Sequence, residues 1–296
     1  MRAIYFTVFA LLCWNISNAQ LPNTNVYLFK MEQVNDSLFN FKNPQLLTGF
    51  NPNGYNNQPH FISNDELYIS VEDIRDKSQT DIISLNLNTQ VKTLVTQSED
   101  REYSPALLPE KYYFSCIRQE NDGFDTQRLW VFPIDRSTDG RVILKNQDKI
   151  GYHCWLTNET VALFIVGPPH YLALANTEDE TVMKLTSNIG RSLQKLPNGN
   201  LAFLHKATET NWTIKELNLE TLRTKTIVAA RPESEDFIVL KNGTILMSQG
   251  QKIFKYRIGK DTRWLEIGDF SKLGLNNIKR MAVSPDGNNI AIVNSQ

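Results

Sequence analysis

Few features of this 296-residue chain point to a charged partner or to a metal. Its 31 lysine and arginine residues nearly balance 32 aspartate and glutamate residues, so the net charge at pH 7 is −1. Proteins that neutralise nucleic-acid phosphates carry a clustered basic surplus, and we therefore expect no nucleic-acid partner. The chain has neither Cys-x-x-Cys nor His-x-x-x-His spacing. We expect no bound metal and no cofactor.

Cysteine is also scarce, with three residues in the whole chain. Cys13 lies in an N-terminal apolar run, and Cys116 and Cys154 each lie in an apolar, strand-like run. An oxidising compartment would permit a disulfide between the last two. Buried thiols also behave as small apolar side chains, and we expect this second state for both.

Long hydrophobic runs are absent except for Ala3–Trp14. Twelve residues span about 18 Å as a helix, which is too short for a bilayer core of about 30 Å. Arg2 precedes the run, and Ser17 and Ala19 follow it with the small residues that signal peptidase requires. We expect residues 1–19 to be a cleaved signal peptide and residues 20–296 to form one exported domain, periplasmic or secreted, with no transmembrane segment.

The exported part contains a repeat. Each copy is an apolar strand, a short polar turn and a second apolar strand, with turns such as SNDE, TNET, PNGN, KNGT and PDGN. The residue before each turn recurs after about 40–48 residues; these residues are Ile62, Leu108, Leu156, Leu196, Leu240 and Ser284. A repeat of this length with several strands per copy is typical of a β-propeller.

Six copies account for an all-β, six-bladed β-propeller with four antiparallel strands in each blade. The sixth copy begins near Ile278 and ends after two strands. Two earlier apolar segments, Asn25–Met31 and Pro44–Thr48, have no inner hairpin of their own. We expect them to pair with the C-terminal hairpin and close the ring, which removes free sheet edges.

The turn Ser284-Pro285-Asp286-Gly287, flanked by MAV and NIAIV, resembles the repeat of TolB-like, WD-type propellers. The turns ending at Gly199 and Gly243 are similar, and residues 113–174 also resemble exported TolB-like propellers of Gram-negative bacteria. The resemblance covers all six repeats and implies a periplasmic or secreted binding scaffold. TolB carries an α/β domain ahead of its propeller and binds a peptidoglycan-associated lipoprotein at the propeller mouth. We expect that extra domain to be absent, and carry over the fold without the partner.

Candidate site residues follow from the inner strand of each blade, which lines the channel of a propeller. Side chains alternate along a strand. One set is mostly apolar, including Phe61, Trp155 and Phe237, and should pack between blades. The other set is more polar and, with charged residues just upstream, should line the channel and its mouth. The candidate ligand-binding residues are Gln58, His60, Glu102, Ser104, Tyr152, Arg191, Ser192, Asp236 and Arg280.

The same alternation turns His60 and His153 to opposite faces. We found no catalytic arrangement: a His60–Glu102 pair would need a geometry that the sequence does not supply, and there is no Gly-x-Ser-x-Gly elbow. The polar channel is equally compatible with a water-filled bore that binds nothing specific.

We expect a monomeric, non-catalytic scaffold that binds a protein, a peptide or another envelope component at the channel mouth. The alternative is a divalent-metal-dependent hydrolase or lyase with its site in the channel. That enzyme would have Asp236, Asn57 and Glu102 as ligands, whereas calcium typically takes six to eight oxygens. A third hypothesis is a scaffold that uses its blade edges, with Phe50–Gln58 as a contact loop.

Overall fold

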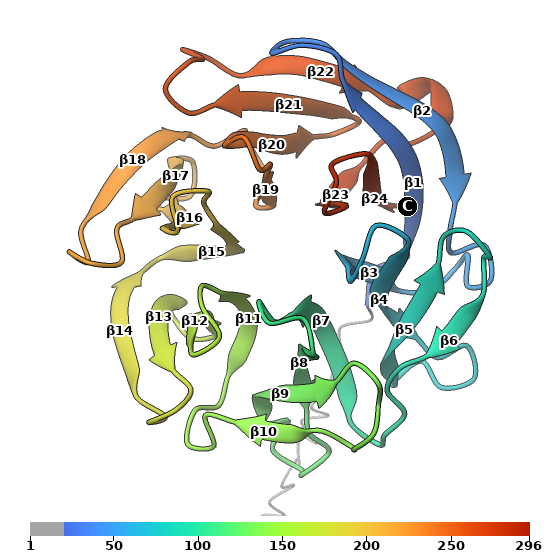
Figure 1. Ribbon diagram of the computed structural model, residues 1–296, viewed down its shortest axis with the longest axis vertical. Helices are drawn as coiled ribbons and strands as arrows, with labels where there is room; N and C mark the ends of the chain where they lie inside the picture. Colours follow the sequence, from blue (N-terminus) through green and yellow to red (C-terminus); the bar gives the residue numbers. More distant parts are fainter. Residues whose placement is uncertain (1–20) are drawn as a thin grey trace, which may run out of the picture.

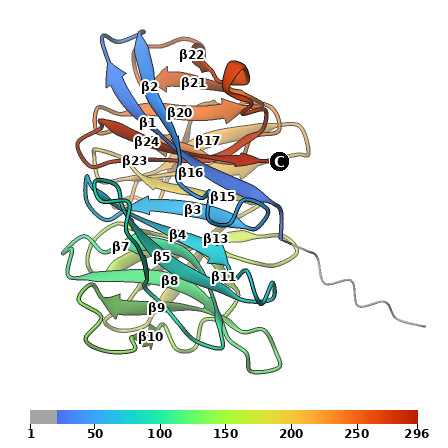
Figure 2. The ribbon, with the colours of Figure 1, turned by 90° about the vertical axis from the view of Figure 1, so that its right-hand side faces the viewer.

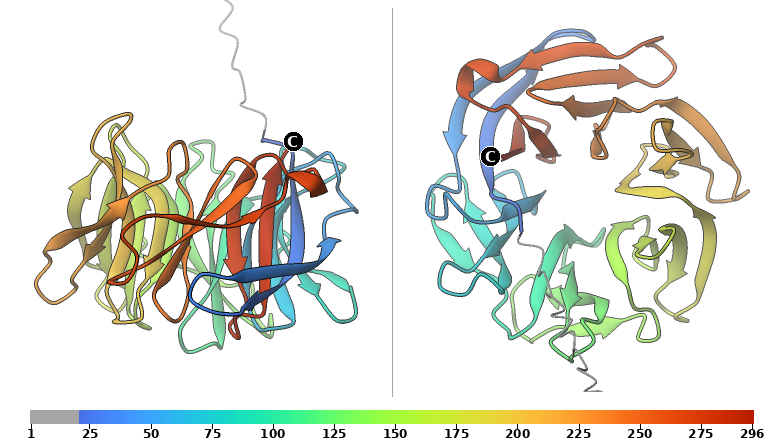
Figure 3. Two further views of the ribbon diagram at one scale, coloured as in Figure 1. Left: turned by 90° about the horizontal axis from the view of Figure 1, so that it is seen from above. Right: turned by 180° about the vertical axis from the view of Figure 1, so that it is seen from behind.

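The computed structural model describes residues 21–296, so the predicted signal peptide lies outside the described part of the chain. Within that part, 24 strands form six antiparallel sheets of four strands each, arranged as a ring around a central channel (Figure 1). Figure 3 shows the ring from its side and from behind. The prediction of a six-bladed, all-β propeller is confirmed. No helix in the described range is long and apolar enough to cross a membrane.

Blades 1 to 3 follow one another along the chain, with the channel-facing strand first. Blade 1 contains β3 (Asn56–Phe61), β4 (Glu66–Glu72), β5 (Thr80–Asn86) and β6 (Lys92–Leu94). Blade 2 contains β7 (Arg101–Leu107), β8 (Tyr113–Gln119), β9 (Gln127–Pro133) and β10 (Arg141–Ile143). Blade 3 contains β11 (Ile150–Trp155), β12 (Thr160–Ile165), β13 (Tyr171–Asn176) and β14 (Val182–Ser187).

Blades 4 and 5 repeat this order, and blade 6 combines the two ends of the chain. Blade 4 contains β15 (Ile189–Lys195), β16 (Leu201–Lys206), β17 (Trp212–Leu217) and β18 (Thr224–Ala229). Blade 5 contains β19 (Phe237–Val239), β20 (Thr244–Gln249), β21 (Lys252–Arg257) and β22 (Leu265–Asp269), followed by a 3₁₀ turn, η1 (Ser271–Leu273). Blade 6 contains β23 (Ile278–Val283), β24 (Asn289–Ser295), β1 (Thr24–Gln33) and β2 (Phe39–Leu46).

Ring closure occurs in blade 6, as the sequence predicted. Strand β1 pairs antiparallel with β24 over seven residue pairs, from Thr24 with Ser295 to Lys30 with Asn289, and the two strands lie side by side in Figure 2. The outer strand differs from the prediction, because it begins at Phe39 rather than at Pro44. Its register shifts near Asn43, which has a φ of 53°. Proline is tolerated there because β2 is an edge strand.

The inner hairpins turn on the polar segments that define the repeat. In blade 4, the Leu196 N–H bonds the Asn200 carbonyl and the Gly199 N–H bonds the Leu196 carbonyl. Gly199 has a φ of 87°, and the equivalent Gly243 and Gly287 both have a φ of 81°. Glycine takes this left-handed conformation without the steric cost of a Cβ atom. The recurring glycine therefore marks a tight turn on one face of the ring.

The hydrophobic core is divided into six clusters, and each lies between two neighbouring blades. The cluster between blades 5 and 6 includes Phe29, which is 1% exposed and contacts Phe270 edge-to-face with ring centroids 5.1 Å apart. Between blades 1 and 2, Tyr68 makes a similar contact with Phe114 at 5.2 Å. The predicted apolar packing of Phe61 and Trp155 between blades is confirmed.

A buried contact between Glu102 and Arg118 lies beside the connection between blades 1 and 2. Glu102 is fully buried, and its carboxylate lies 3.0 Å from Nε of Arg118. The Ser98 hydroxyl, on the connection, donates to Glu102 at 2.6 Å. The Arg118 guanidinium stacks 4.1 Å above the Trp130 ring, which shields the pair from water. The Glu102 side chain therefore bonds groups within the protein and does not reach the channel.

The first prediction concerns ring closure. Phe29→Ala should reduce the free energy of unfolding by about 3–5 kcal/mol, because it leaves a cavity in the cluster that joins β1 to blade 5. The measurement is equilibrium denaturation of residues 20–296 by urea. Val34→Ala is the matched control, since Val34 is 49% exposed just after the same strand and should change stability by less than about 0.5 kcal/mol. Equal effects of the two variants would contradict the assignment.

The second prediction concerns Glu102. Burial raises the pKa of its carboxyl from 4.5 to about 7, against the opposing effects of the Ser98 hydrogen bond and the Arg118 charge. The native state therefore binds this proton more tightly than the unfolded chain does. The resulting stability is fully present below about pH 4.5 and is lost as the pH rises through 7.

The test compares wild type with Glu102→Gln, which cannot titrate. The difference between their unfolding free energies should change by at most about 3 kcal/mol between pH 4.5 and 7, with wild type losing stability relative to the variant as pH rises. Using the difference cancels the contributions of all other titrating groups. A difference that is constant over this interval would show that the Glu102 pKa is not raised.

Candidate binding site at the channel mouth

The channel contains a cavity of about 520 Å³, lined by the inner strands of all six blades. Neighbouring residues of one strand, such as Tyr152 and His153, both line it. The expected alternation holds, because Tyr152 and Cys154 pack toward blade 4 and Trp155 packs toward blade 2. What differs from the expectation is that residues of both faces border the cavity. Five inner strands also carry a β-bulge near their start, seen as a shift in register; these strands are β3, β7, β11, β15 and β23. A bulge redirects the side chains that follow it.

Two of these bulges bring neighbouring blades together by polar contacts. Gln58 and Ser104 occupy equivalent bulge positions, with φ values of 56° and 54°. The Ser104 N–H donates to Oε1 of Gln58 at 2.8 Å. Further along the same two strands, the Leu107 N–H donates to Nε2 of His60 at 3.0 Å. Gln58 and His60 therefore use their acceptors to join blades 1 and 2.

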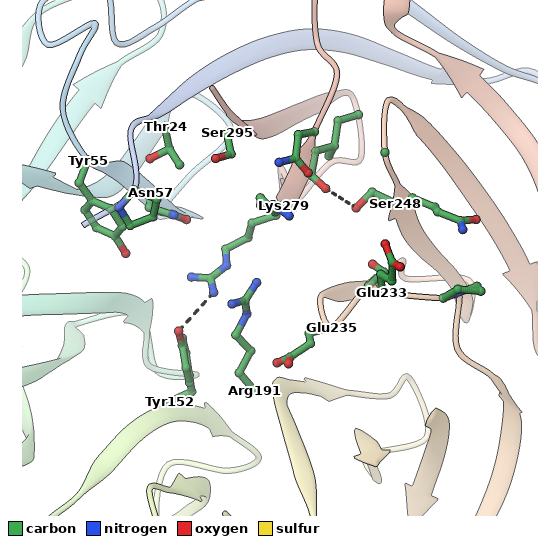
Figure 4. Close-up of a pocket in the computed structure, with 18 of the residues that line it drawn as sticks. Thr24, Tyr55, Asn57, Tyr152, Arg191, Glu233, Glu235, Ser248, Lys279 and Ser295 are labelled. Carbon is green, nitrogen blue, oxygen red and sulfur yellow. Dashed lines mark hydrogen bonds between the residues drawn. The ribbon is translucent and has the colours of Figure 1, made fainter. Parts of the chain in front are cut away.

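Above the channel, the face that carries the entries to the inner strands is hollowed into a mouth cavity of about 560 Å³ (Figure 4). Labelled side chains of Tyr152 and Arg191 project toward its centre, and Glu233 and Glu235 lie along one side. Thr24 and Ser295, near the two ends of the described chain, complete the opposite side. The mouth therefore depends on the ring closure described above.

A polar layer separates the mouth cavity from the channel cavity, and four blades contribute to it. We call Tyr152, Arg191, Asp236 and Arg280 the constriction. Nη2 of Arg280, from blade 6, lies 3.5 Å from the Tyr152 hydroxyl on blade 3, which is directly across the ring. Arg191, from blade 4, donates to Asp236 on blade 5 through Nε at 2.8 Å. Tyr152, Arg191 and Arg280 line both cavities.

Positive charge exceeds negative charge in the constriction. Asp236 faces two guanidinium groups, because Arg280 Nε also lies 3.5 Å from its Oδ1 atom. Burial is the largest influence on the pKa of Arg280 and lowers it, but Asp236, Tyr152 and Tyr55 together reverse this, so that the pKa is raised. Burial is also the largest influence on the pKa of Arg191 and lowers it, but the charge and hydrogen bond of Asp236, with Tyr152, reverse this, so that the pKa is raised. Both arginines are charged at any physiological pH.

The histidines of the channel are neutral. Burial lowers the pKa of His60 to about 4. Burial also lowers the pKa of His153 to about 3, and the proximity of His60 contributes. The two rings border the same cavity but face opposite ways, as expected: His60 contacts Leu107 of the following blade, and His153 contacts Ser115 of the preceding blade. His153 Nε2 lies 2.6 Å from the Ser115 hydroxyl, which is itself fully buried and accepts a bond from the Trp155 indole at 2.9 Å.

The two cysteines of the described chain are free. Cys116 is buried, as expected, and burial raises its pKa well above the ordinary value. Cys154 is only partly buried and lines the channel, where burial raises its pKa to about 12. Both are therefore protonated thiols at neutral pH.

Eight of the nine candidate residues line the channel or its mouth. Glu102 does not, because its side chain is enclosed beside Arg118 behind the inner strand. The sequence reasoning missed Tyr55, Glu233 and Ser248. They lie in connections between blades and at the outer end of a second strand, and a search restricted to the inner strands excludes such positions.

The constriction is suited to holding a polar or anionic group from the mouth side. Two guanidinium groups close to one carboxylate repel a cation by Coulomb interaction in a partly desolvated site. Among residues 21–296, no three His, Cys, Asp or Glu side chains are grouped as metal ligands.

Comparisons with known proteins identify the fold. No family model matches the sequence, and no curated protein matches it either. Among solved structures, a presumed TolB from Agrobacterium tumefaciens aligns with 93% of this chain and 99% of its own, with a TM-score of 0.65 and 11% identity. TolB from Acinetobacter baumannii aligns with 93% of this chain and 64% of its own, with a TM-score of 0.56 and 10% identity.

A gluconolactonase from Xanthomonas campestris also aligns, over 82% of this chain and 86% of its own, with a TM-score of 0.60 and 7% identity. Identities this low establish the architecture alone, since one fold hosts many functions. The chain has the TolB-like, six-bladed β-propeller fold that its turn sequences indicated.

Proposed function

We propose that this protein is an exported, non-catalytic binding scaffold that takes a segment of a protein or peptide of the cell envelope at its channel mouth. One observation carries the proposal: the 560 Å³ mouth cavity ends on a polar layer assembled from four different blades. Cavities of this size with a few convergent polar groups are the usual form of a ligand site. The TolB-like fold supports a scaffold of this kind.

Aromatic and arginine side chains make the mouth suitable for a protein partner. Tyr152 packs edge-to-face on Phe164 with ring centroids 5.6 Å apart, and Arg280 lies 5.3 Å from the Tyr152 ring centroid. Tyr55 and Trp212 add further aromatic surface to the cavity wall. Tyr, Trp and Arg dominate the energetics of protein interfaces because they combine apolar area with directed hydrogen bonds.

The alternative function is a divalent-metal-dependent hydrolase or lyase in the channel, and the gluconolactonase-like fold favours it. The charges of the constriction oppose it. A cation placed between the two cavities would lie beside Arg191 and Arg280, with Asp236 as the one carboxylate in that layer. The scaffold therefore agrees better with the electrostatics of the site.

The mouth is tested by Tyr152→Ala and Arg280→Ala. Tagged residues 20–296 are incubated with an envelope extract, and recovered proteins are quantified by mass spectrometry. We expect each variant to recover the specific partner at least about tenfold less than wild type, as for residues central to an interface. Lys241→Ala, in an exposed turn on the opposite face, should recover it unchanged. Equal recovery by all variants would place the binding surface elsewhere.

Calcium titration separates the scaffold from the enzyme. Because the constriction has a positive surplus, we expect millimolar calcium to leave the thermal unfolding midpoint of the protein unchanged. Isothermal calorimetry should show no saturable heat. A stoichiometric site of micromolar affinity would stabilise the fold by mass action, and that result would support the metal-dependent enzyme instead.

A further inference from the structure

Arg280 has hydrogen-bonding capacity that the protein barely uses. A guanidinium group carries five N–H donors. Its two polar contacts, to Asp236 Oδ1 and to the Tyr152 hydroxyl, are both 3.5 Å long, whereas N–H···O bonds centre near 2.9–3.0 Å. The side chain is only 14% exposed. No nitrogen of Arg280 is among the buried polar atoms without a partner, so its remaining donors face the two cavities that it lines and can bond a ligand there.

Asp236 does not bond Arg280 closely, because its carboxylate already accepts hydrogen bonds from Arg191. Two donors of Arg191 converge on Oδ2 of Asp236, one of them from Nε at 2.8 Å. The single carboxylate therefore neutralises one guanidinium and leaves the other in excess. The constriction carries one net positive charge at the floor of the mouth cavity.

The location of this charge favours a ligand that enters from the mouth. Arg191 and Arg280 line the mouth cavity as well as the channel, and Figure 4 shows Arg191 and Tyr152 extending into it. On the rim, Glu235 pairs with Lys206, and Glu233 and Lys279 carry opposite charges, so these four side chains have no net charge. The excess charge of the site therefore comes from the constriction, and a single anionic group would neutralise it.

We propose that the constriction binds a carboxylate of the ligand, seated between Arg280, Arg191 and the Tyr152 hydroxyl. This inference rests on the proposed function and names the chemical group that the mouth recognises. A planar guanidinium presents two parallel donors that match a carboxylate, which makes such pairs short and directional. The carboxylate comes either from the C-terminal end of a peptide or from an acidic side chain within it.

The direct test uses protein labelled with ¹⁵N-arginine, and it follows the Nε–H resonances of Arg280 and Arg191 by NMR. Sodium acetate is the simplest probe, with sodium chloride at equal ionic strength as its control. Two short peptides distinguish the sources: acetyl-triglycine with a free carboxylate, and acetyl-Gly-Asp-Gly-amide. Acetyl-triglycine-amide has the same backbone without a carboxylate.

We expect acetate and at least one carboxylate peptide to shift the Arg280 resonance saturably, with dissociation constants of order millimolar for such small probes. Arg280→Gln should weaken this binding at least about tenfold. Arg263→Gln removes an arginine from the exposed turn between β21 and β22 and should have no effect. Stronger binding of the free-carboxylate peptide would identify a chain end, and stronger binding of the aspartate peptide would identify a side chain.

Equal binding of the amide peptide, or no saturable shift with acetate and both carboxylate peptides, would overturn the inference. If Arg280→Gln does not fold, Arg280→Lys keeps the charge but lacks the planar fork, and carboxylate binding should still weaken about tenfold. The proposed function fails separately: a partner that is recovered equally by Tyr152→Ala does not use the mouth. If recovery of the partner needs Tyr152 but does not need any carboxylate of the partner, the mouth is still the binding surface. That result would overturn only the inference about the carboxylate.

Discussion

The structure depends on apolar packing between neighbouring blades around a closed ring. Each blade buries its two faces against two neighbours, so an open ring would leave two apolar faces and a sheet edge in water. Pairing of β1 with β24 prevents this, because it makes the first and last strands parts of one sheet. The mouth depends on the same contact, since Thr24 and Ser295 form part of its wall. The stability of the ring and the shape of the mouth therefore depend on the same pairing.

The inner strands that line the channel are irregularly paired with the second strand of their blade. Bulges at five of the six inner strands interrupt the ladders where the blades converge. Side chains and backbone groups released there bond to the next blade instead, as Gln58 does with Ser104. Across the ring, Arg280 lies opposite Tyr152, and this contact forms part of the charged layer that narrows the channel. The site is thus built from contacts between blades, which no single repeat contains.

The repeat can be read from the sequence because every blade needs the same inner hairpin. A hairpin needs a polar turn, often with glycine at positive φ, between two apolar strands, and six such turns appear in the sequence at blade spacing. Glu102 shows where this reasoning stops. It lies near the start of inner strand β7, as Arg191 does in β15, yet its side chain is enclosed beside Arg118. Sequence position specified the strand but not the direction in which a bulged strand turns its side chains.

The amino-acid sequence by itself determined the number of blades, the four-stranded pattern and the closure by both chain ends, because periodicity and turn residues act over short distances. The tertiary structure alone decided that Arg280 faces Asp236 and Tyr152 from other blades. These residues are separated by 44 and 128 positions, and their meeting depends on the curvature of the ring and on the bulges. Local patterns carry no record of such long-range geometry, although it produces the excess charge at the mouth.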